Sequence, residues 1–304
     1  MAKPKNLPTS VVVVETYGEL EHYARAFADG HLNLLMLCGA PGLGKSQCFR
    51  RALTSKVCWI NGNASALGIY LQAHEHRNQP MVLDDVDGLY RDRHGIRLLK
   101  ALCQTDKVKT VSWQTAMATR LGIPRQFSTT SKVAIIANQW TALNADVAAL
   151  EDRGHCLQFA PSALEVHRQA AGWFWDQDVF DFVAAHLHVT DHPSLRSYVL
   201  AWELKTAGLN WRQAVLSRCL TGVALEVAKL KSNPSFANEE DRVRAFVAAG
   251  LGCRATYFNY GKKLQPHQGN SAIKLTHSSP PGEVKPSEDF LDNLRRRYGP
   301  LGKG

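Results

Sequence analysis

The stretch Gly39-Ala40-Pro41-Gly42-Leu43-Gly44-Lys45-Ser46 decides the fold of this chain. It fits the pattern GxxxxGKS, in which glycines let the backbone wrap closely and aim its N–H groups at phosphate oxygens. The apolar run 32–38 comes directly before it and predicts a buried strand, and residues 47–53 can open a helix without a breaker. Because strand, glycine-rich loop and helix follow in the required order, we predict a site for the phosphates of a nucleotide.

Two side chains of this loop have separate chemical tasks. Lys45 is expected to reach the β- and γ-phosphates, and the Ser46 hydroxyl is expected to bind magnesium. The predicted cofactors are therefore ATP and Mg²⁺. The residues predicted to hold the nucleotide are Gly39, Ala40, Pro41, Gly42, Leu43, Gly44, Lys45, Ser46 and Gln47.

A second motif is an apolar strand that ends in carboxylates, the residues 80–89 with the sequence PMVLDDVDGL. The end of a strand beside the phosphate loop is where an aspartate that organises magnesium must lie. We assign Asp84 to the metal and Asp85 to the polarisation of the attacking water. Asp87 is better explained as a helix N-cap or a surface charge.

Composition limits the class of protein. The chain has 304 residues, of which 45% are hydrophobic, enough for a core domain and a smaller second domain. Seven cysteines without a CxxC pair argue against a disulfide framework and a zinc site, and fit a reducing cytoplasm. The start of the chain lacks the apolar core of a signal peptide, and no 18-residue apolar run exists, so we expect a cytoplasmic protein without a membrane partner.

The net charge of +9 is unevenly placed. Residues 1–189 carry 19 Lys and Arg against 17 Asp and Glu, whereas residues 190–304 carry 17 against 10. A basic final third favours a polyanionic partner, because neutralising phosphates releases counterions. Charge that merely keeps the protein in solution explains the excess equally well.

Strands and helices alternate in the first half of the chain. Apolar runs at 11–14, 57–60, 108–113 and 132–138 predict further strands, the run 132–138 being the last, and the segments between them have helical spacing. This alternation predicts an α/β fold with a parallel sheet covered on both faces, which together with the loop indicates a three-layer nucleotide-binding core. From about residue 161 the pattern becomes helical, with helices expected at 163–173, 179–186, 194–207 and 211–230.

These boundaries give four predicted regions. They are a nucleotide-binding core at 1–160, a helical lid at 161–232, a helix-turn-helix at 233–264 and a flexible basic tail at 265–304. In the third region a helix at 239–250 is followed by a glycine turn and a second helix at 253–264. The second helix would present to duplex DNA the residues Arg254, Thr256, Asn259, Lys262 and Lys263, with Ala255 and Phe258 packed inward. An ordinary helical hairpin with a solvated basic face is an equal alternative.

Between about residues 30 and 230 these elements resemble the AAA+ ATPases, a family of P-loop NTPases. GAPGLGKS is similar to the family's GPPGTGKT-type loop, and LDDVD is similar to its hhDEID strand end. Asn138, after the strand IIA, lies where the family keeps its sensor-1 residue, whose amide contacts the γ-phosphate or orients the water. Arg196, in the segment PSLR, lies where the family keeps the sensor-2 arginine that touches nucleotide; a surface arginine is the alternative.

The resemblance also implies an interface between subunits. The segment ALEDRGH is similar to the family's arginine-finger segment, so Arg153 would reach the ATP site of a neighbouring subunit. Many members carry a second arginine where this chain has His155, which leaves one finger. A local ion pair of Arg153 with Asp152 or Glu151 is the alternative. The implied partner is a second copy of the chain, in a ring or a filament.

Three functions follow from these features. The first is an ATPase of the helicase-loader, initiator or transposition-regulator kind, which hydrolyses ATP and acts on DNA. The second is an AAA+ machine that remodels a protein client, since Gly68-Ile69-Tyr70 lies where some members carry a loop that grips polypeptide; helix packing is the alternative. The third is an ATP-binding switch with very slow hydrolysis, since Asp85 stands where the family commonly places glutamate.

Overall fold

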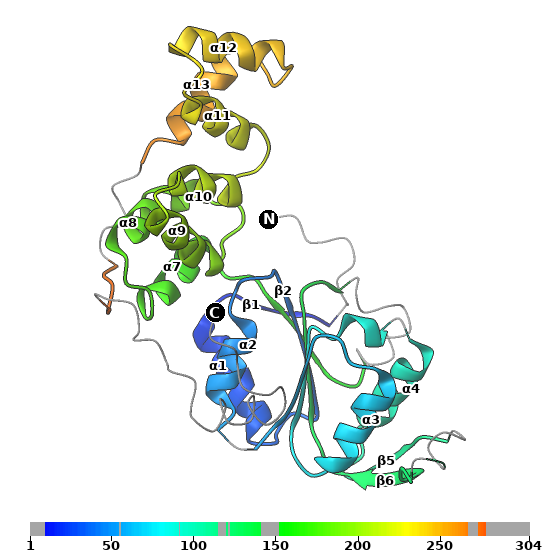
Figure 1. Cartoon of the computed structure of the whole chain (residues 1–304). Helices are drawn as coiled ribbons and strands as arrows, with labels where there is room; N and C mark the ends of the chain where they lie inside the picture. Colours follow the sequence, from blue (N-terminus) through cyan, green and yellow to red (C-terminus); the bar gives the residue numbers. More distant parts are fainter. Residues whose placement is uncertain are drawn as a thin grey trace, which may run out of the picture. The chain divides into compact units, whose positions relative to one another are not determined.

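The computed structural model describes residues 10–54, 56–90, 92–114, 120, 122–140, 152–266 and 273–277. The chain divides into two compact units (Figure 1). The first consists of residues up to 166 together with residues 192–196, and the second of residues 167–191 and those from 197 onward. The predicted boundary between the core at 1–160 and the lid at 161–232 lies at residue 160. The boundary between the two observed units lies near residue 166, inside a helix.

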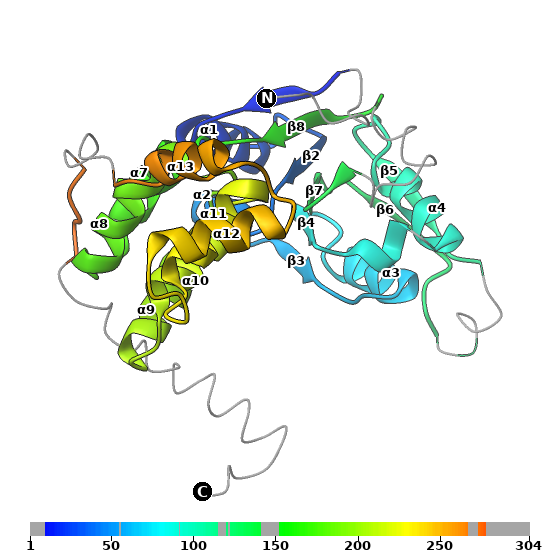
Figure 2. The ribbon, with the colours of Figure 1, turned by 90° about the horizontal axis from the view of Figure 1, so that it is seen from above.

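A six-stranded parallel sheet forms the centre of the first unit, with the order β1-β8-β2-β7-β4-β3 (Figure 2). All residues of β2 and β7 are buried, as expected for parallel strands covered on both faces. The strands are β1 (Val12–Val14), β2 (Leu34–Gly39), β3 (Cys58–Asn61), β4 (Met81–Asp84), β7 (Val133–Ala137) and β8 (His155–Phe159).

Helices cover both faces of this sheet. α1 (Tyr17–Ala28) and α2 (Lys45–Ala52) lie on one face, and α3 (Ala66–Glu75) and α4 (Arg93–Leu102) lie on the other (Figure 1). A short 3₁₀ helix, η1 (Asp87–Tyr90), precedes α4. The predicted three-layer α/β fold with a parallel sheet, followed by a helical region, is confirmed.

The prediction that 132–138 is the last strand is wrong. β8 follows it and lies between β1 and β2, with Leu37 opposite Leu157. The sequence HCLQF is short and carries His155 at its exposed start and a half-buried Gln158, so its apolar pattern is weak. This strand is defined by its pairing with the edge of β2, which depends on the tertiary structure and has no local sequence signal.

A two-stranded antiparallel hairpin, β5 (Lys109–Ser112) and β6 (Gln126–Thr129), packs beside α3. The Tyr70 ring lies 5.2 Å from that of Phe127, and the Tyr70 hydroxyl donates to the Pro124 carbonyl at 2.6 Å. Ile69 and Tyr70 are fully buried within α3. Of the two roles considered for residues 68–70, the loop that grips polypeptide is therefore wrong and the alternative, helix packing, is confirmed.

The second unit is helical. The predicted helix 211–230 is in fact two helices, because the chain turns at residues 220–221 and Gly222 has φ +54°. The elements are α7 (Ala163–Ala171), which begins in the first unit, α8 (Gln177–His186), the 3₁₀ helix η4 (Leu187–Val189), α9 (Arg196–Thr206), α10 (Trp211–Cys219), α11 (Gly222–Ser232), α12 (Glu239–Ala248) and α13 (Arg254–Lys263).

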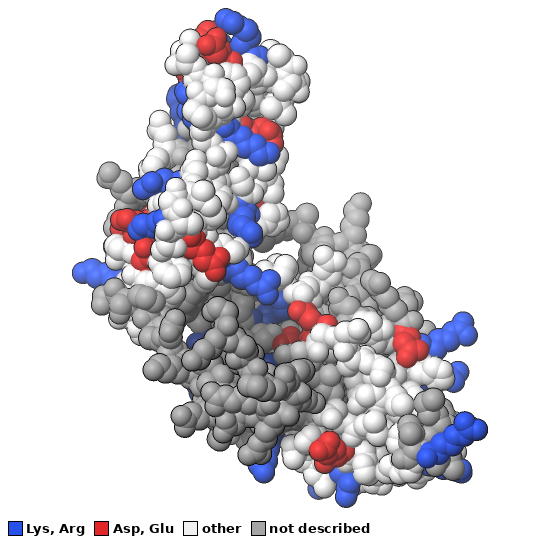
Figure 3. Space-filling model, in the orientation of Figure 1, with Lys and Arg blue, Asp and Glu red and all other residues white. Residues whose placement is uncertain are grey.

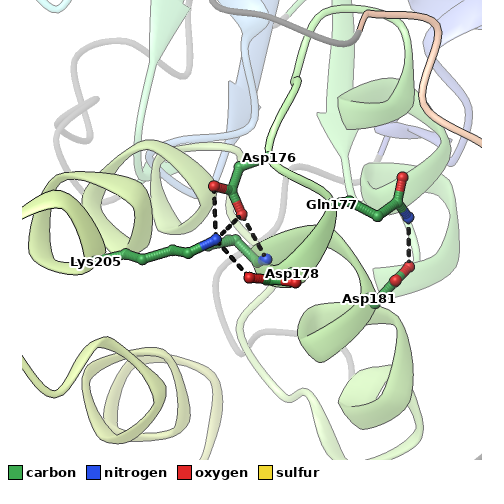
Figure 4. Close-up of polar contacts among 6 residues, drawn as sticks. Asp176, Gln177, Asp178, Asp181 and Lys205 are labelled. Carbon is green, nitrogen blue, oxygen red and sulfur yellow. Dashed lines mark hydrogen bonds and ion pairs between the residues drawn. The ribbon is translucent and has the colours of Figure 1, made fainter.

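Two polar features fix the first helices of this unit. Lys205 of α9 bridges Asp176 at 2.8 Å and Asp178 at 2.7 Å, and Asp176 also caps the first turn of α8 (Figure 4). His167 is fully buried, stacks on Phe180 at 3.9 Å and shares a 2.8 Å hydrogen bond with the Tyr198 hydroxyl. Burial lowers the pKa of His167 from 6.5 to about 4.

The last three helices form a small core of their own around Val227, Phe246 and Tyr257. Tyr257 is fully buried, whereas Phe258 is 37% exposed and Ala255 is exposed. The prediction that Phe258 and Ala255 face inward is wrong: the helix α13 is rotated so that Tyr257 and Gly261 face α11 and α12. Cys253 forms the N-cap of α13 and is exposed, while the other six cysteines are buried.

Part of the predicted tail is placed by contacts with α7. Thr276 donates to the Ala171 carbonyl through both its N–H and its hydroxyl, at 3.0 and 2.9 Å. These bonds provide a partner for a carbonyl at the C-terminal end of α7 that has none within the helix. The remaining tail residues, 267–272 and 278–304, lie outside the described residues. No helix in the described part of the chain is long and apolar enough to cross a membrane.

Candidate nucleotide site

The glycine-rich loop joins β2 to α2 at the carboxyl end of the sheet. Gly44 is the N-cap of α2 with φ +73°, and Gly42 has φ +82°, a region that side chains other than hydrogen strongly disfavour. The helix α2 begins at Lys45, so its first N–H groups and the positive end of its dipole face the loop. The sequence-predicted anion site thus has the local geometry that phosphate binding requires.

Lys45 is buried at 6% exposure within this loop. Its ammonium donates to the carbonyls of Gly39 at 2.8 Å and Ala40 at 3.0 Å, and to Asn138 Oδ1 at 3.1 Å. Burial lowers the pKa of Lys45, and the charges of Asp85 and Asp84 oppose that effect. A cation held here by carbonyl oxygens can exchange those partners for phosphate oxygens without moving into solvent.

Ser46 and Asp84 lie together at the ends of α2 and β4. The Ser46 hydroxyl donates to Asp84 Oδ1 at 2.8 Å, and Asp84 is 8% exposed. Burial raises the pKa of Asp84, the Ser46 hydrogen bond lowers it, and the neighbouring Asp85 raises it further. One carboxylate and one hydroxyl oxygen fit Mg²⁺, which takes few protein ligands and completes its shell with phosphates and water. In keeping with so sparse a set, the described residues hold no cluster of three His, Cys, Asp or Glu that could bind a metal.

Asn138 connects the two halves of the site. It follows β7, which lies between β2 and β4 in the sheet, so it emerges between the loop and the acidic strand end. Its Oδ1 accepts from Lys45 and its Nδ2 donates to Asp85 Oδ1 at 2.8 Å. Because an ammonium can only donate and a carboxylate can only accept, these neighbours fix the orientation of the amide.

Asp85 is exposed and has φ +53°, the one positive φ of a non-glycine residue among those described. Its backbone N–H donates to the Ile136 carbonyl at 3.0 Å, which holds this conformation against β7. Aspartate and asparagine tolerate the left-handed region better than glutamate does. The backbone therefore gives a physical reason for aspartate at a position where the resembling family commonly has glutamate.

Arg196 lies close to the loop, and the segment 192–196 that carries it belongs to the first unit. The Leu195 N–H donates to the Gly42 carbonyl at 2.9 Å, and the Arg196 side chain passes within 3.7 Å of where a Cβ of Gly42 would stand. Arg196 is exposed and begins α9. Its positive charge also lowers the pKa of Lys45, which indicates that the two cations face a common region.

Arg153 lies at the other end of the sheet. It precedes β8, where Leu35 pairs with His155 and Gly39 with Phe159, so about six residues of strand separate it from the loop. At about 3.3 Å per residue, that is roughly 20 Å from the loop of its own chain. Its guanidinium donates to the Lys100 carbonyl of α4 at 2.9 Å. Glu151, one of the two partners considered for the alternative ion pair, lies outside the described residues.

The five residues proposed for DNA contact all lie on α13, and their surroundings differ. Arg254 pairs with Glu240 of α12 at 2.5 Å and lies over the Phe258 ring, whereas Lys262 and Lys263 are exposed in the last turn. Asn259 is exposed, and Thr256 is half-buried with a contact to Cys253. On the face drawn in Figure 3, the end that carries α12 shows acidic and basic groups side by side and no continuous basic stripe.

Tyr17 is a residue near the loop that the sequence motifs do not reveal. It opens α1, is 6% exposed, and donates from its hydroxyl to the Leu43 carbonyl at 2.9 Å. The one signal available in the sequence is an aromatic residue just after the capping Thr16, and that position is ordinary for core packing.

No model of a protein family matches this chain. An uncharacterized 36.7 kDa protein of Enterobacteria phage T4, from the nrdC-mobD intergenic region, is 31% identical over 121 residues. The matched part is 36% of this chain and 37% of that protein, so the chain aligns with little more than a third of its relative.

Similar solved structures include Cdc6p from Pyrobaculum aerophilum, with 14% identity, a TM-score of 0.38, and coverage of 97% of this chain and 87% of that one. A point mutant of RuvB from Thermotoga maritima has 14% identity, a TM-score of 0.43 and coverage of 80% and 83%. NtrX from Brucella abortus, in complex with ATP, has 13% identity, a TM-score of 0.37 and coverage of 86% and 69%. Scores below 0.5 do not assign the chain to a family, so its function must be argued from the loop, the acidic strand end and the residues between them.

Proposed function

We propose that this chain is an AAA+ ATPase that binds ATP with Mg²⁺, assembles through interfacial ATP and acts on DNA. The observation that carries the ATPase part is the hydrogen-bonded series Lys45–Asn138–Asp85, with Ser46 and Asp84 beside it. Asn138 and the two aspartates come from the ends of two adjacent parallel strands, β7 and β4, and Lys45 and Ser46 come from the start of α2. A phosphate-binding lysine, an amide and two carboxylates in that order are the parts that phosphoryl transfer to water needs.

Each residue has a distinct task in this proposal. The loop N–H groups and Lys45 hold the phosphates, and Asp84 and Ser46 would hold Mg²⁺, which supplies charge neutralisation at the phosphate oxygens. Asp85 accepts a proton from the attacking water, and Asn138 fixes the Asp85 carboxylate while its own amide contacts the phosphate side. Arg196 approaches from the segment beside Gly42 and adds positive charge at the nucleotide.

The assembly part of the proposal rests on Arg153. Because it lies roughly 20 Å along the sheet from the loop of its own chain, only the site of a neighbouring subunit is open to it as a finger. The competing role is structural, since its bond to the Lys100 carbonyl satisfies the C-terminal turn of α4. Melting of the Arg153→Ala variant, measured beside its activity, separates the two roles.

The first experiment measures the ATPase rate against protein concentration, with and without duplex DNA. Lys45→Ala and Arg153→Ala are compared with the unaltered chain at each concentration. A rate that rises with concentration and with DNA, and that both variants abolish, supports the whole proposal. A rate that rises with concentration but ignores DNA favours a protein client, and a rate indifferent to both concentration and Arg153 refutes the interface.

The two alternatives now differ in support. The burial of Ile69 and Tyr70 weakens the alternative of a machine that remodels a protein client, because these side chains are not available to grip polypeptide. An ATP-binding switch with slow hydrolysis keeps its support, since the aspartate at position 85 is held in a left-handed conformation with a shorter reach than glutamate.

A further inference from the structure

The carbonyl groups of the glycine-rich loop are almost fully used by donors of the protein. Gly39 and Ala40 accept from Lys45 Nζ, and Gly44 accepts from the N–H of Cys48 in the first turn of α2. The two carbonyls at the tip, those of Gly42 and Leu43, accept from groups far away in the sequence. Within the described residues no hydrogen bond to a protein group uses the N–H of Gly42, Leu43 or Gly44. A phosphate-binding loop requires this arrangement, in which the carbonyl acceptors bond to other parts of the protein and the N–H donors stay available for phosphate oxygens.

The donor for Leu43 is the Tyr17 hydroxyl, at 2.9 Å in a buried setting. Leu43 is 3% exposed, so water has little access to its carbonyl. Tyr17 is itself held firmly: its N–H donates to Glu165 at 3.1 Å and its ring packs edge-on against Phe159 at 5.1 Å. Burial raises the pKa of Tyr17, so the hydroxyl remains a donor throughout the neutral range.

The donor for Gly42 is the backbone N–H of Leu195, at 2.9 Å. This contact is close-packed, because a Cβ on Gly42 would overlap the Ser194 hydroxyl and a Cβ on Gly44 would stand 2.9 Å from Leu195 Cδ1. Consecutive carbonyls at the tip of the loop are therefore held from two elements, the start of α1 and the segment 192–196.

We propose that Tyr17 is a positioning residue for nucleotide binding, which with the Leu195 N–H fixes the tip of the loop by its outward carbonyls. This inference rests on the proposed nucleotide site. Without the hydroxyl, the Leu43 peptide can turn so that its carbonyl reaches water, which also turns the N–H of Gly44 away from the phosphates. The contact made by the loop tip is common to ATP and ADP, so both should lose affinity equally, while the hydrolysis step, made by Asp85 and Asn138, should not change.

The test compares Tyr17→Phe with Tyr70→Phe in the full chain. Tyr70 is a matched control, because it too is a buried tyrosine of the first unit whose hydroxyl donates to a backbone carbonyl, that of Pro124. Calorimetric titration with ATP and with ADP, in the presence of Mg²⁺, gives the Kd of each variant, and single-turnover hydrolysis at saturating ATP gives the chemical rate. Thermal melting without nucleotide reports the stability of each variant.

We expect Tyr17→Phe to raise the Kd of ATP and of ADP by the same factor, roughly threefold to tenfold, with the single-turnover rate unchanged. Tyr70→Phe should leave both Kd values as they are, even where it lowers the melting temperature as much. Equal Kd values for the two variants, or a loss confined to ATP, would overturn the role of Tyr17 while leaving the ATPase proposal standing. Failure of the unaltered, folded chain to bind either nucleotide would overturn both.

Discussion

The side-chain amide of Asn138 donates to Asp85 Oδ1 at 2.8 Å and accepts from Lys45 on its other side. In the proposed site, the Asn138 amide would therefore connect the phosphates held by Lys45 with the water held by Asp85. If the proposed site holds ATP, loss of the γ-phosphate would therefore alter the surroundings of Asn138 directly.

Asn138→Asp should slow hydrolysis by about 10²-fold while ATP still binds. The substitution keeps the shape of the side chain but replaces the donor to Asp85 with a second carboxylate, so the two oxygens repel. Rapid-quench measurement of phosphate release and a separate titration with ATP distinguish the two effects. Lys45→Ala is the contrasting variant, since it should abolish binding itself; similar rates for Asn138→Asp and the unaltered chain would contradict the assigned role.

The left-handed backbone of Asp85 predicts a strong dependence on the residue type. Asp85→Asn should hydrolyse ATP about 10²-fold more slowly with stability within roughly 0.5 kcal/mol of the original, because asparagine also tolerates φ +53°. Asp85→Val should lose activity and about 1–2 kcal/mol of unfolding free energy as well. Urea denaturation and turnover are measured on all three proteins. Rates near zero for the unaltered chain and unchanged in Asp85→Asn would instead support the slow switch.

Lys262 and Lys263 should carry more of any DNA affinity than Arg254 does. Both lysines are exposed at the end of α13, whereas Arg254 is already paired with Glu240. Replacing both lysines by alanine should reduce the slope of log K against log salt by about 2, and Arg254→Ala should reduce it by less. Fluorescence anisotropy with a labelled duplex at several salt concentrations measures the slope. Lys229→Ala is the control, because Lys229 is paired with Glu226 on α11, and an equal loss in all variants would indicate nonspecific attraction.

His167 should make the second unit sensitive to acid. Its pKa is about 4 in the folded chain and 6.5 when unperturbed, so the unfolded state binds the extra proton between these values. The contribution of His167 to the free energy of unfolding is therefore fully present above pH 6.5. It is lost as the pH is lowered toward 4, and the loss amounts to roughly 3 kcal/mol at most. Urea denaturation of the unaltered chain and of His167→Phe at pH 7 and pH 5 should show a smaller pH effect in the variant. His192→Gln, at an exposed position, should keep the original pH dependence.

The elements at the proposed phosphate site could be predicted because each depends on local sequence. The loop 39–46 requires its glycines, and the strand before Asp84 is an uninterrupted apolar run. The errors lie where tertiary contacts decide. Strand β8 forms only against the free edge of β2, and the break at Gly222 separates two helices whose apolar spacing is continuous.

The two hydrogen bonds that hold the loop tip from outside, one from a side chain and one from a backbone N–H, could not be predicted from local sequence. Tyr17 is 26 residues from Leu43 in sequence, and Leu195 is more than 150 residues from Gly42, so neither contact has a local signature. The rotation of α13 that buries Tyr257 and exposes Phe258 has the same origin, because aromatic residues at adjacent positions are equivalent until the partner helices are known.

Of the seven cysteines, Cys253 alone is exposed, and the helix N-terminus that it caps lowers its pKa, through hydrogen bonds from Thr256 and Ala255. A thiolate forms more readily there than at the six buried thiols. A maleimide dye should therefore attach at one position without any engineered substitution. The chain thus offers a site for a spectroscopic label at the start of α13, about two turns of helix before Asn259 and about two and a half before Lys262.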